Sequence, residues 1–477
     1  MLFTFLFTLF IKSEILNPVI LVPGLYGSNL YVTYGPEIEV PWYCPKQMDD
    51  ELLWIGSKFI IPPLMNCACI VSTTKFDNET NQVHNQPGVS INVHDFGGIG
   101  SVDYIIKMQS KYHQNENSTS DKNFKDTFKN KISNLHFFDN FHTFIEFFES
   151  KGYTVGQNFF VAPYDWRMGP LYTDDFWPLL RELIENAYKK SHGKKITLIG
   201  FSMGTFMIQQ FLAADKLIKK ARYERIFNPY TRILTSVKDP KVVVSEKWKR
   251  KYIEKVIFLA PSFGGSLAIY DAIQMRYSPL TPSFRNEYIS DVVTSLPSIH
   301  SHLLNHVIFN NVSVARGPDG ENYTAKNFRD LISNYSHIRE EFVPILDITQ
   351  GLQKNAPIDI GEKIPLMVIY NSKVPTMSFL DFNRGWEKDP VRYYEEVGDG
   401  TIPARGPRYI CNHWDSSHRP LVCIDLQNRD SKHYKHSALV SNLDVLKLIY
   451  NATVNLNLNS EIWWKKNGPI NIELNEK

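Results

Sequence analysis

The sequence of 477 residues lacks the patterns that commonly hold metal ions. It contains no Cys-x-x-Cys pair, no His-Glu-x-x-His run and no calcium-binding loop, so it predicts neither a metal site nor any other cofactor. Its 52 lysines and arginines nearly balance 50 aspartates and glutamates, and nothing in this charge selects nucleic acid as a partner. Beyond the N-terminus no apolar run approaches the roughly 18 residues of a membrane span, so we expect a soluble or peripheral protein.

A shorter apolar run opens the chain. Met1 to Ile11 is almost entirely apolar and is followed by Lys12 and Ser13. The run is too short for a membrane span of about 20 residues, and it is typical of the apolar part of a signal peptide. Residues 1–13 are therefore predicted to be a cleaved signal peptide, with a strand of the core as the alternative.

Two further features favour export. Six Asn-x-Ser/Thr triplets are candidate glycosylation sites: Asn78, Asn117, Asn311, Asn322, Asn334 and Asn451. In an oxidising compartment the five cysteines can form two disulfides and leave one thiol over: Cys44, Cys67, Cys69, Cys411 and Cys423.

Short apolar runs alternate with amphipathic segments along the chain. The runs predict buried strands at residues 18–22, 159–161, 196–199, 256–259 and 366–370. Helical spacing appears at residues 137–148, at 176–188, after Ser202 and at 439–449. Buried strands that alternate with helices predict an α/β protein, with a mostly parallel sheet and helices on both faces.

Three stretches interrupt this alternation. Residues 40–70 hold an apolar patch flanked by cysteines, and residues 109–131 are polar, which is typical of a surface insertion. Residues 216–251 carry 12 Lys and Arg against 3 Asp and Glu. We interpret this basic insertion as a solvated face, with attraction to anionic lipid as the alternative.

The strongest chemical signal is the pentad Gly200-Phe-Ser202-Met-Gly204 between a predicted strand and a helical run. In a nucleophile elbow the chain turns so sharply that the serine takes a strained backbone conformation and the flanking positions must be glycine. The turn would lift the Ser202 hydroxyl above the sheet edge and aim the Met203 N–H at an oxyanion. An ordinary turn between a strand and a helix is the alternative.

A serine nucleophile needs a base and an acid, which follow it in the order Asp or Glu, then His, when the fold carries such an elbow. Asp399 stands between two glycines after a predicted strand, so we predict that it is the acid, with an ordinary turn aspartate as the alternative. His436 directly precedes the last helical run and is the predicted base, with His433 as the runner-up. The second oxyanion donor is expected after the first strand, where Gly24 precedes the Leu25 N–H; a plain turn is the alternative.

Together these residues resemble the lecithin:cholesterol acyltransferase family, which includes lysosomal phospholipase A2 and the phospholipid:diacylglycerol acyltransferases. The matching motifs follow the family's order: 18–24, 162–167, 200–204, 260–265, 398–401, and His436 with Asn442. The most specific motif is Ala162-Pro-Tyr-Asp-Trp-Arg167, which looks like the family's scaffold around the acyl site. We therefore expect structural roles for Asp165, Trp166 and Arg167.

The resemblance implies an α/β-hydrolase fold without cofactor or metal. It also implies a membrane-binding subdomain at residues 40–70 and a lid region at residues 266–310. With the signal peptide at 1–13 and the basic insertion at 216–251, the predicted hydrolase core comprises residues 14–39 and 71–455. The resemblance further implies a short disulfide loop from Cys44 to Cys67 or Cys69.

The sequence departs from the family pattern at three positions. Phe201 stands where a histidine is usual, and Thr205 where glycine or asparagine is common, which could change the floor of the pocket. Val368 occupies the place of a cysteine, so the family's second disulfide is absent and a Cys411–Cys423 bridge is only a possible substitute.

Residues 54–65 concentrate large apolar side chains beside two prolines. Taken alone, they favour a buried satellite core, whereas the resemblance favours docking on a membrane. The candidate membrane-binding residues are Trp54, Phe59, Ile60 and Ile61.

The resemblance implies that Ser202 takes a fatty acyl group from a phospholipid and passes it to a lipid alcohol or to water. The implied partners are a phospholipid membrane or lipoprotein-like surface and a lipid alcohol acceptor. The implied location is outside the cell or in the lysosomal or endomembrane lumen. A purely hydrolytic phospholipase or lipase is one alternative, and a catalytically inactive lipid-binding protein is another.

Overall fold

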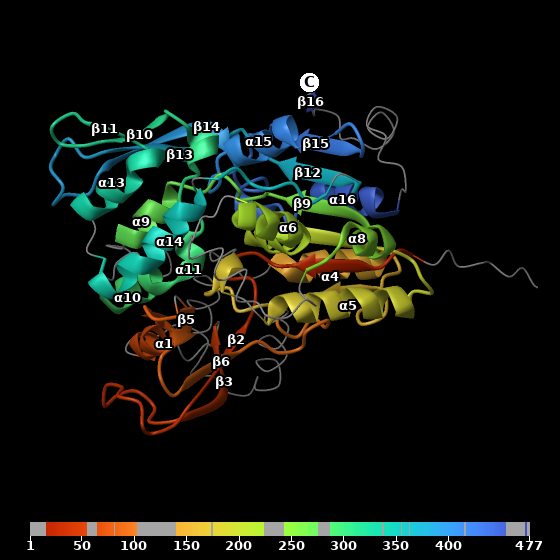
Figure 1. Cartoon of the computed structure of the whole chain (residues 1–477), viewed down its shortest axis with the longest axis horizontal. Coiled ribbons are helices and arrows are strands. Elements are labelled where there is room, and N and C mark those ends of the chain that lie inside the picture. Colours follow the sequence, from red (N-terminus) through yellow and green to blue (C-terminus); the bar gives the residue numbers. More distant parts are fainter. Residues whose placement is uncertain are drawn as a thin grey trace, which may run out of the picture.

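A mostly parallel β-sheet forms the centre of the computed structural model of this chain (Figure 1). The structure describes residues 16–54, 64–80, 82–102, 140–172, 175–223, 243–274, 287–335, 338–353, 355–361, 363–414, 416–454 and 473–474. The strand order is β16-β15-β12-β9-β8-β1-β7, and only β16 is antiparallel to its neighbour. The strands are β1 (Val19–Val22), β7 (Phe159–Val161), β8 (Ile196–Phe201), β9 (Ile253–Leu259), β12 (Leu366–Tyr370), β15 (Leu421–Asp425) and β16 (Glu473–Leu474).

Alternate residues of these strands enter two separate cores. In β1, Ile20 and Val22 belong to one cluster and Val19 and Leu21 to the other, because successive side chains of a strand point to opposite faces. Among the helices, α5 (Phe176–Lys190), α6 (Met203–Tyr223) and α8 (Glu246–Tyr252) contribute to the first cluster, and α4 (Asn140–Ser150) and α16 (Leu443–Val454) contribute to the second. The predicted α/β fold with helices on both faces of a mostly parallel sheet is confirmed.

All five predicted strands lie in this sheet, whereas β15 and β16 had no prediction. The last helix also differs from its predicted form, because it begins only at Leu443, whose side chain is 56% exposed. Asn442 caps the N-terminus of this helix, since its Oδ1 accepts hydrogen bonds from the N–H groups of Asp444 and Val445. Leu439 is buried in the turn before it. The predicted helix over residues 439–449 therefore combined a buried turn residue, Leu439, with a helix that begins at Leu443.

Three smaller sheets flank the main one. They contain β11 (Asn322–Thr324), β10 (Ser313–Arg316), β13 (Val374–Asp381) and β14 (Val391–Gly398); β3 (Met48–Trp54), β2 (Leu30–Tyr34) and β6 (Val89–Asn92); and β4 (Thr74–Asp77) with β5 (Gln82–Asn85). The other α-helices are α1 (Leu64–Ser72), α9 (Ala268–Gln274), α10 (Glu287–Ser295), α11 (Pro297–His300), α12 (His306–Phe309), α13 (Phe328–Tyr335), α14 (Val343–Gln353) and α15 (Arg405–His413). Short 3₁₀ turns are η2 (Gly169–Leu171), η3 (Ala325–Asn327), η4 (Glu340–Phe342) and η5 (His436–Ala438).

The strands and helix of residues 30–92 form a separate layer below the main sheet, at the lower left of Figure 1. We call these residues the N-terminal layer. A disulfide joins Cys44 to Cys67 within it. Arg167 attaches the layer to the core, because its guanidinium donates to the Ser72 carbonyl at 3.0 Å and to Asn85 Oδ1 at 2.6 Å. This fully buried arginine is also paired with Asp165.

The basic insertion is only partly described, since residues 224–242 lie outside the described ranges. Lys249 does not fit the expected solvated face. Its side chain is buried, and its Nζ donates to Glu246 and to the Ile360 carbonyl. Residues 1–13 are also outside the described part of the chain. No helix within the described ranges has the length and apolar content needed to cross a membrane.

Candidate active site

The turn after β8 holds Ser202 in a left-handed backbone conformation, with φ of 52°. The glycines around it are required by space. A Cβ on Gly204 would lie 2.2 Å from the Val22 carbonyl oxygen, and one on Gly200 would lie 2.9 Å from Thr205 Cα. The main chain thus packs against itself so closely that only glycine fits, as the elbow geometry requires.

Ser202, His436 and Asp399 form one continuous chain of hydrogen bonds. His436 Nε2 lies 2.8 Å from Ser202 Oγ, and His436 Nδ1 lies 2.7 Å from Asp399 Oδ2. All three residues are buried. Because the ionised carboxylate only accepts, the Nδ1 proton points to Asp399 and the Nε2 lone pair faces the serine hydroxyl. This tautomer lets the imidazole take the serine proton.

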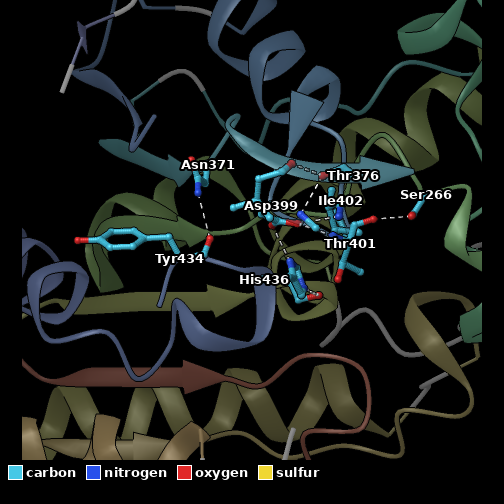
Figure 2. Close-up of polar contacts among 12 residues, drawn as sticks. Ser266, Asn371, Thr376, Asp399, Thr401, Ile402, Tyr434 and His436 are labelled. Atoms are coloured by element: carbon cyan, nitrogen blue, oxygen red, sulfur yellow. Dashed lines mark hydrogen bonds and ion pairs between the residues drawn. The ribbon is translucent and has the colours of Figure 1, made fainter. Parts of the chain in front are cut away.

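Local hydrogen bonds orient the carboxylate of Asp399 (Figure 2). Its Oδ1 accepts from the backbone N–H groups of Thr401 at 3.1 Å and Ile402 at 2.7 Å. Thr376 Oγ1 accepts from the Gly400 N–H at 2.8 Å. Charge-assisted bonds of this kind hold an ionised carboxylate in one orientation, so Oδ2 stays directed at the histidine.

The loop that carries His436 is fixed by its own contacts. The His436 N–H donates to the Asp399 carbonyl at 2.7 Å, which ties the two loops together. Upstream, the Asn371 side-chain amide donates to the Tyr434 carbonyl, as Figure 2 shows. The Phe201 ring lies 5.3 Å from the imidazole, so the residue that departs from the family pattern packs against the base.

The runner-up histidine lies elsewhere. His433 Nδ1 is 2.6 Å from Asp430 Oδ2, and its side chain is 59% exposed. The structure therefore brings His436, and not His433, to the serine.

The two expected oxyanion donors lie on segments that meet at the elbow. Met203 is the first residue of α6, and the loop after β1 carries Leu25. A Cβ on Gly24 would be 3.0 Å from Ser202 Cβ, so the backbone of this loop closely approaches the serine. The oxyanion roles of both N–H groups stay a prediction.

Ser262 and His302 form a second buried pair near the elbow, which the sequence did not single out. Their side chains lie 3.0 Å apart, and His302 Nδ1 is 2.7 Å from the Ser298 carbonyl. Burial, with a smaller contribution from the nearby His436, lowers the pKa of His302 to about 4. The only signal for this pair was the serine within the Ala260-Pro-Ser motif. The hydroxyl of Thr205, which departs from the family pattern, donates to the Ser202 carbonyl; its effect on the pocket floor stays a prediction.

The candidate membrane-binding residues are only partly described. Trp54 packs inward: its Nε1 donates to the Tyr26 carbonyl at 3.0 Å, and its ring lies 5.2 Å from that of Trp166. This packing does not agree with a membrane anchor. Phe59, Ile60 and Ile61 lie outside the described residues. Sequence reasoning missed Trp42, which is 93% exposed in the same segment.

The remaining predicted sites are placed as follows. Disulfides join Cys44 to Cys67 and Cys411 to Cys423, and Cys69 is a buried free thiol whose pKa is raised to about 12 by burial. The exposed glycosylation candidates are Asn78, Asn311, Asn322 and Asn334; Asn451 is partly buried, and Asn117 is outside the described residues. Within the described ranges, no three His, Cys, Asp or Glu side chains form a group that could hold a metal ion.

Comparisons with known proteins identify the family of this chain. The family model for lecithin:cholesterol acyltransferase matches residues 50–355. Mouse phosphatidylcholine-sterol acyltransferase is 24% identical over 88% of this chain and 83% of its own length. Bovine lysosomal phospholipase A and acyltransferase is 23% identical over 90% of this chain and 89% of its own length. In the crystal structure of the Tle4–Tli4 complex, one chain is similar over 90% of this chain and 96% of its own length, with a TM-score of 0.43 and 12% identity. Because the family model covers more than half of the residues, this chain belongs to the lecithin:cholesterol acyltransferase family.

Proposed function

We propose that this protein is a lipid O-acyltransferase and phospholipase A that works through a Ser202 acyl-enzyme. The observation that carries this proposal is the hydrogen-bonded chain from Ser202 through His436 to Asp399. The relatives support the substrate class, since their names describe a phosphatidylcholine-sterol acyltransferase and a lysosomal phospholipase A and acyltransferase.

In the first half-reaction Ser202 Oγ attacks an ester carbonyl of a phospholipid while His436 takes the serine proton. Asp399 stabilises the imidazolium that forms. The backbone N–H groups of Leu25 and Met203 stabilise the oxyanion, a contribution of about 3–4 kcal/mol for each donor. His436 then gives its proton to the leaving lysophospholipid oxygen, and the acyl group stays on Ser202.

In the second half-reaction an acceptor hydroxyl attacks the acyl-enzyme and His436 acts as the base again. A lipid alcohol gives a new ester, whereas water gives a free fatty acid. Both acceptors react with the same intermediate, so the triad itself does not choose between transfer and hydrolysis.

Covalent labelling tests the nucleophile. A fluorophosphonate probe should label the wild-type protein, and Ser202→Ala should abolish the label. Ser262→Ala is the matched control, because this buried serine also faces a histidine. Labelling that persists in Ser202→Ala would exclude the proposed nucleophile.

A separate assay measures the acceptor. Phospholipid vesicles are incubated with the enzyme, with and without a long-chain alcohol or a sterol, and the products are separated. A new ester that grows at the expense of free fatty acid supports acyl transfer. Release of fatty acid alone, at every alcohol concentration, would leave a purely hydrolytic phospholipase.

The domain assignments belong to the same proposal. Residues 40–70 are proposed to dock on a lipid surface and residues 266–310 to take the place of the lid, in a protein exported through a signal peptide at residues 1–13. The exposure of Trp42 supports docking, since an exposed tryptophan suits the membrane interface. The two disulfides support an oxidising compartment.

Docking has its own test. Trp42→Ser and Phe59→Ser should weaken vesicle binding by roughly tenfold and leave hydrolysis of a dispersed short-chain ester unchanged. Tyr394→Ser is the control, because this tyrosine is 55% exposed on β14. An equal loss on both substrates would exclude a membrane role for these residues.

A further inference from the structure

A cavity of about 480 Å³ lies beside the loop that carries Asp399, and neither Ser202 nor His436 lines it. One wall is a face of the small sheet, formed by Arg316 of β10, Met377, Phe379 and Asp381 of β13, and Tyr393, Glu395 and Val397 of β14. Tyr393 and Glu395 lie two residues apart on β14, so their side chains share one face. The register between β13 and β14 shifts at Ser378, which also lines the cavity. Val397 and Pro403, which also lines the cavity, flank Asp399 in sequence. The segment 397–403 therefore both carries Asp399 and forms part of the cavity wall.

Two of the four charged residues in this cavity compensate each other. Arg316 Nε lies 3.2 Å from Asp381 Oδ1, and its Nη2 contacts Oδ2. The hydrogen bond from Arg316 is the main cause that lowers the pKa of Asp381. This ion pair leaves little net charge for a ligand.

The other two charges, Arg405 and Glu395, are exposed and have no such partner. Neither forms an ion pair with any residue in the described ranges. The Arg405 guanidinium lies over the Phe309 ring, 5.8 Å from its centroid. Arg405 is also the first residue of α15, whose first turn contains no acid. The helix dipole disfavours a cation at this end, so helix stability does not explain the arginine.

An unpaired cation and an unpaired carboxylate in one cavity select against ligands of a single charge. Arg405 attracts an anion but Glu395 repels it, and Glu395 attracts a cation but Arg405 repels it. A zwitterion satisfies both. The Tyr393 ring is 47% exposed and lies 6.0 Å from the Phe379 ring; such aromatic faces attract quaternary ammonium groups.

We propose that this cavity binds the phosphate–ammonium headgroup of a zwitterionic phospholipid. The phosphate lies against Arg405, and the ammonium lies between Glu395 and Tyr393. Leu267 and Val312 contribute apolar lining for the adjoining part of the lipid. The inference deepens the proposed function and rests on it only for the source of the headgroup, a lipid and not free phosphocholine.

Binding is measured by calorimetry on the full chain carrying Ser202→Ala, so that no turnover is needed. The probes are dodecylphosphocholine below its micelle concentration, phosphocholine, dodecyl phosphate and dodecyltrimethylammonium. The variants are Arg405→Gln and Glu395→Gln, and the control is Lys388→Gln, an exposed cation in the β13–β14 connection that does not line the cavity. Thermal melting checks that each variant stays folded.

We expect saturable binding of dodecylphosphocholine, with weaker binding of the other three probes. Arg405→Gln and Glu395→Gln should each weaken it by about tenfold, while Lys388→Gln should have no effect. The proposal would be overturned if dodecylphosphocholine did not bind, or if Arg405→Gln and Glu395→Gln bound it as tightly as the control Lys388→Gln. So would equal affinity for dodecyl phosphate, which indicates a simple anion site, or for phosphocholine, which indicates a free metabolite. Absence of phospholipase activity in the wild-type protein, with intact binding of dodecylphosphocholine, would count only against the proposed function.

Discussion

The carboxyl edge of the main sheet and the N-terminal layer are held in place by different kinds of contact. At the sheet edge, Ser202 is positioned by its own strained turn, and Asp399 is oriented by N–H groups two and three residues further along. The N-terminal layer depends on distant partners instead. Arg167 reaches across to Ser72, and Thr74 bonds to Ser295, 221 residues away. The comparison teaches that local turns fix the orientation of Ser202 and Asp399, whereas the attachment of the layer depends on a few long-range polar contacts.

The largest effect should come from the sheet edge. Ser202→Ala removes the proposed nucleophile, so kcat/KM on a dispersed short-chain ester should fall by at least about 10⁴-fold. The melting temperature should change little, because the substitution removes one side-chain hydrogen bond, between the Ser202 hydroxyl and His436. Ser262→Ala is the control and should keep most of the turnover. If Ser202→Ala kept activity near the wild-type value, the chemistry would not depend on Ser202 at the sheet edge.

The next effect concerns the attachment of the N-terminal layer. Arg167→Met leaves the Asp165 carboxylate without its cation and removes two bonds to the layer. Breaking a buried pair of this kind costs about 3–5 kcal/mol, measured as the free energy of unfolding in urea. Lys447→Met removes an exposed pair with Asp444 and should cost well under about 1 kcal/mol. Similar losses for the two variants would show that the layer does not depend on Arg167.

Acid should titrate two buried histidines, His300 at the end of α11 and His302 in the turn after it. Burial lowers the pKa values of His300 and His302 to about 4, below the ordinary value of 6.5. The unfolded chain therefore gains protons below pH 6.5 that the folded protein does not bind until about pH 4. Stability is complete above pH 6.5 and should fall between these values, by on the order of 3 kcal/mol for each histidine.

The check is the free energy of unfolding as a function of pH. His300→Leu should flatten the decline between pH 6.5 and 4, because leucine binds no proton. His433→Leu, at an exposed position, should leave the decline unchanged. If the wild-type protein kept constant stability down to pH 4, the neutral state of these buried histidines would be contradicted.

The smallest effect returns to the elbow. Thr205→Val removes the hydrogen bond from the threonine hydroxyl to the Ser202 carbonyl. The loss should cost about 1 kcal/mol of stability and lower kcat/KM by no more than about tenfold. Thr205→Ser keeps the hydroxyl and should restore both values. If Thr205→Ser behaved like Thr205→Val, packing of the methyl group and not the hydrogen bond would support the turn.

Much of the sheet edge could be predicted because its signals are local. A buried strand next to Gly200-Phe-Ser202-Met-Gly204 predicts a sharp turn, and glycines beside Asp399 predict a second one. The choice of His436 over His433 followed from its place before a helical run. In contrast, the inward packing of Trp54 was not predictable, because a tryptophan in an apolar run suits a core and a membrane equally well.

The sequence by itself determined the α/β fold and predicted the residues of the candidate site, because periodic burial and glycine-bounded turns depend on neighbours in the chain. Only the tertiary structure decided which side chains meet across long distances: Ser202 with His436, 234 residues apart, and the charged face of the small sheet with Arg405. The physical reason is that the packing of the whole chain selects such contacts, and no local pattern encodes them.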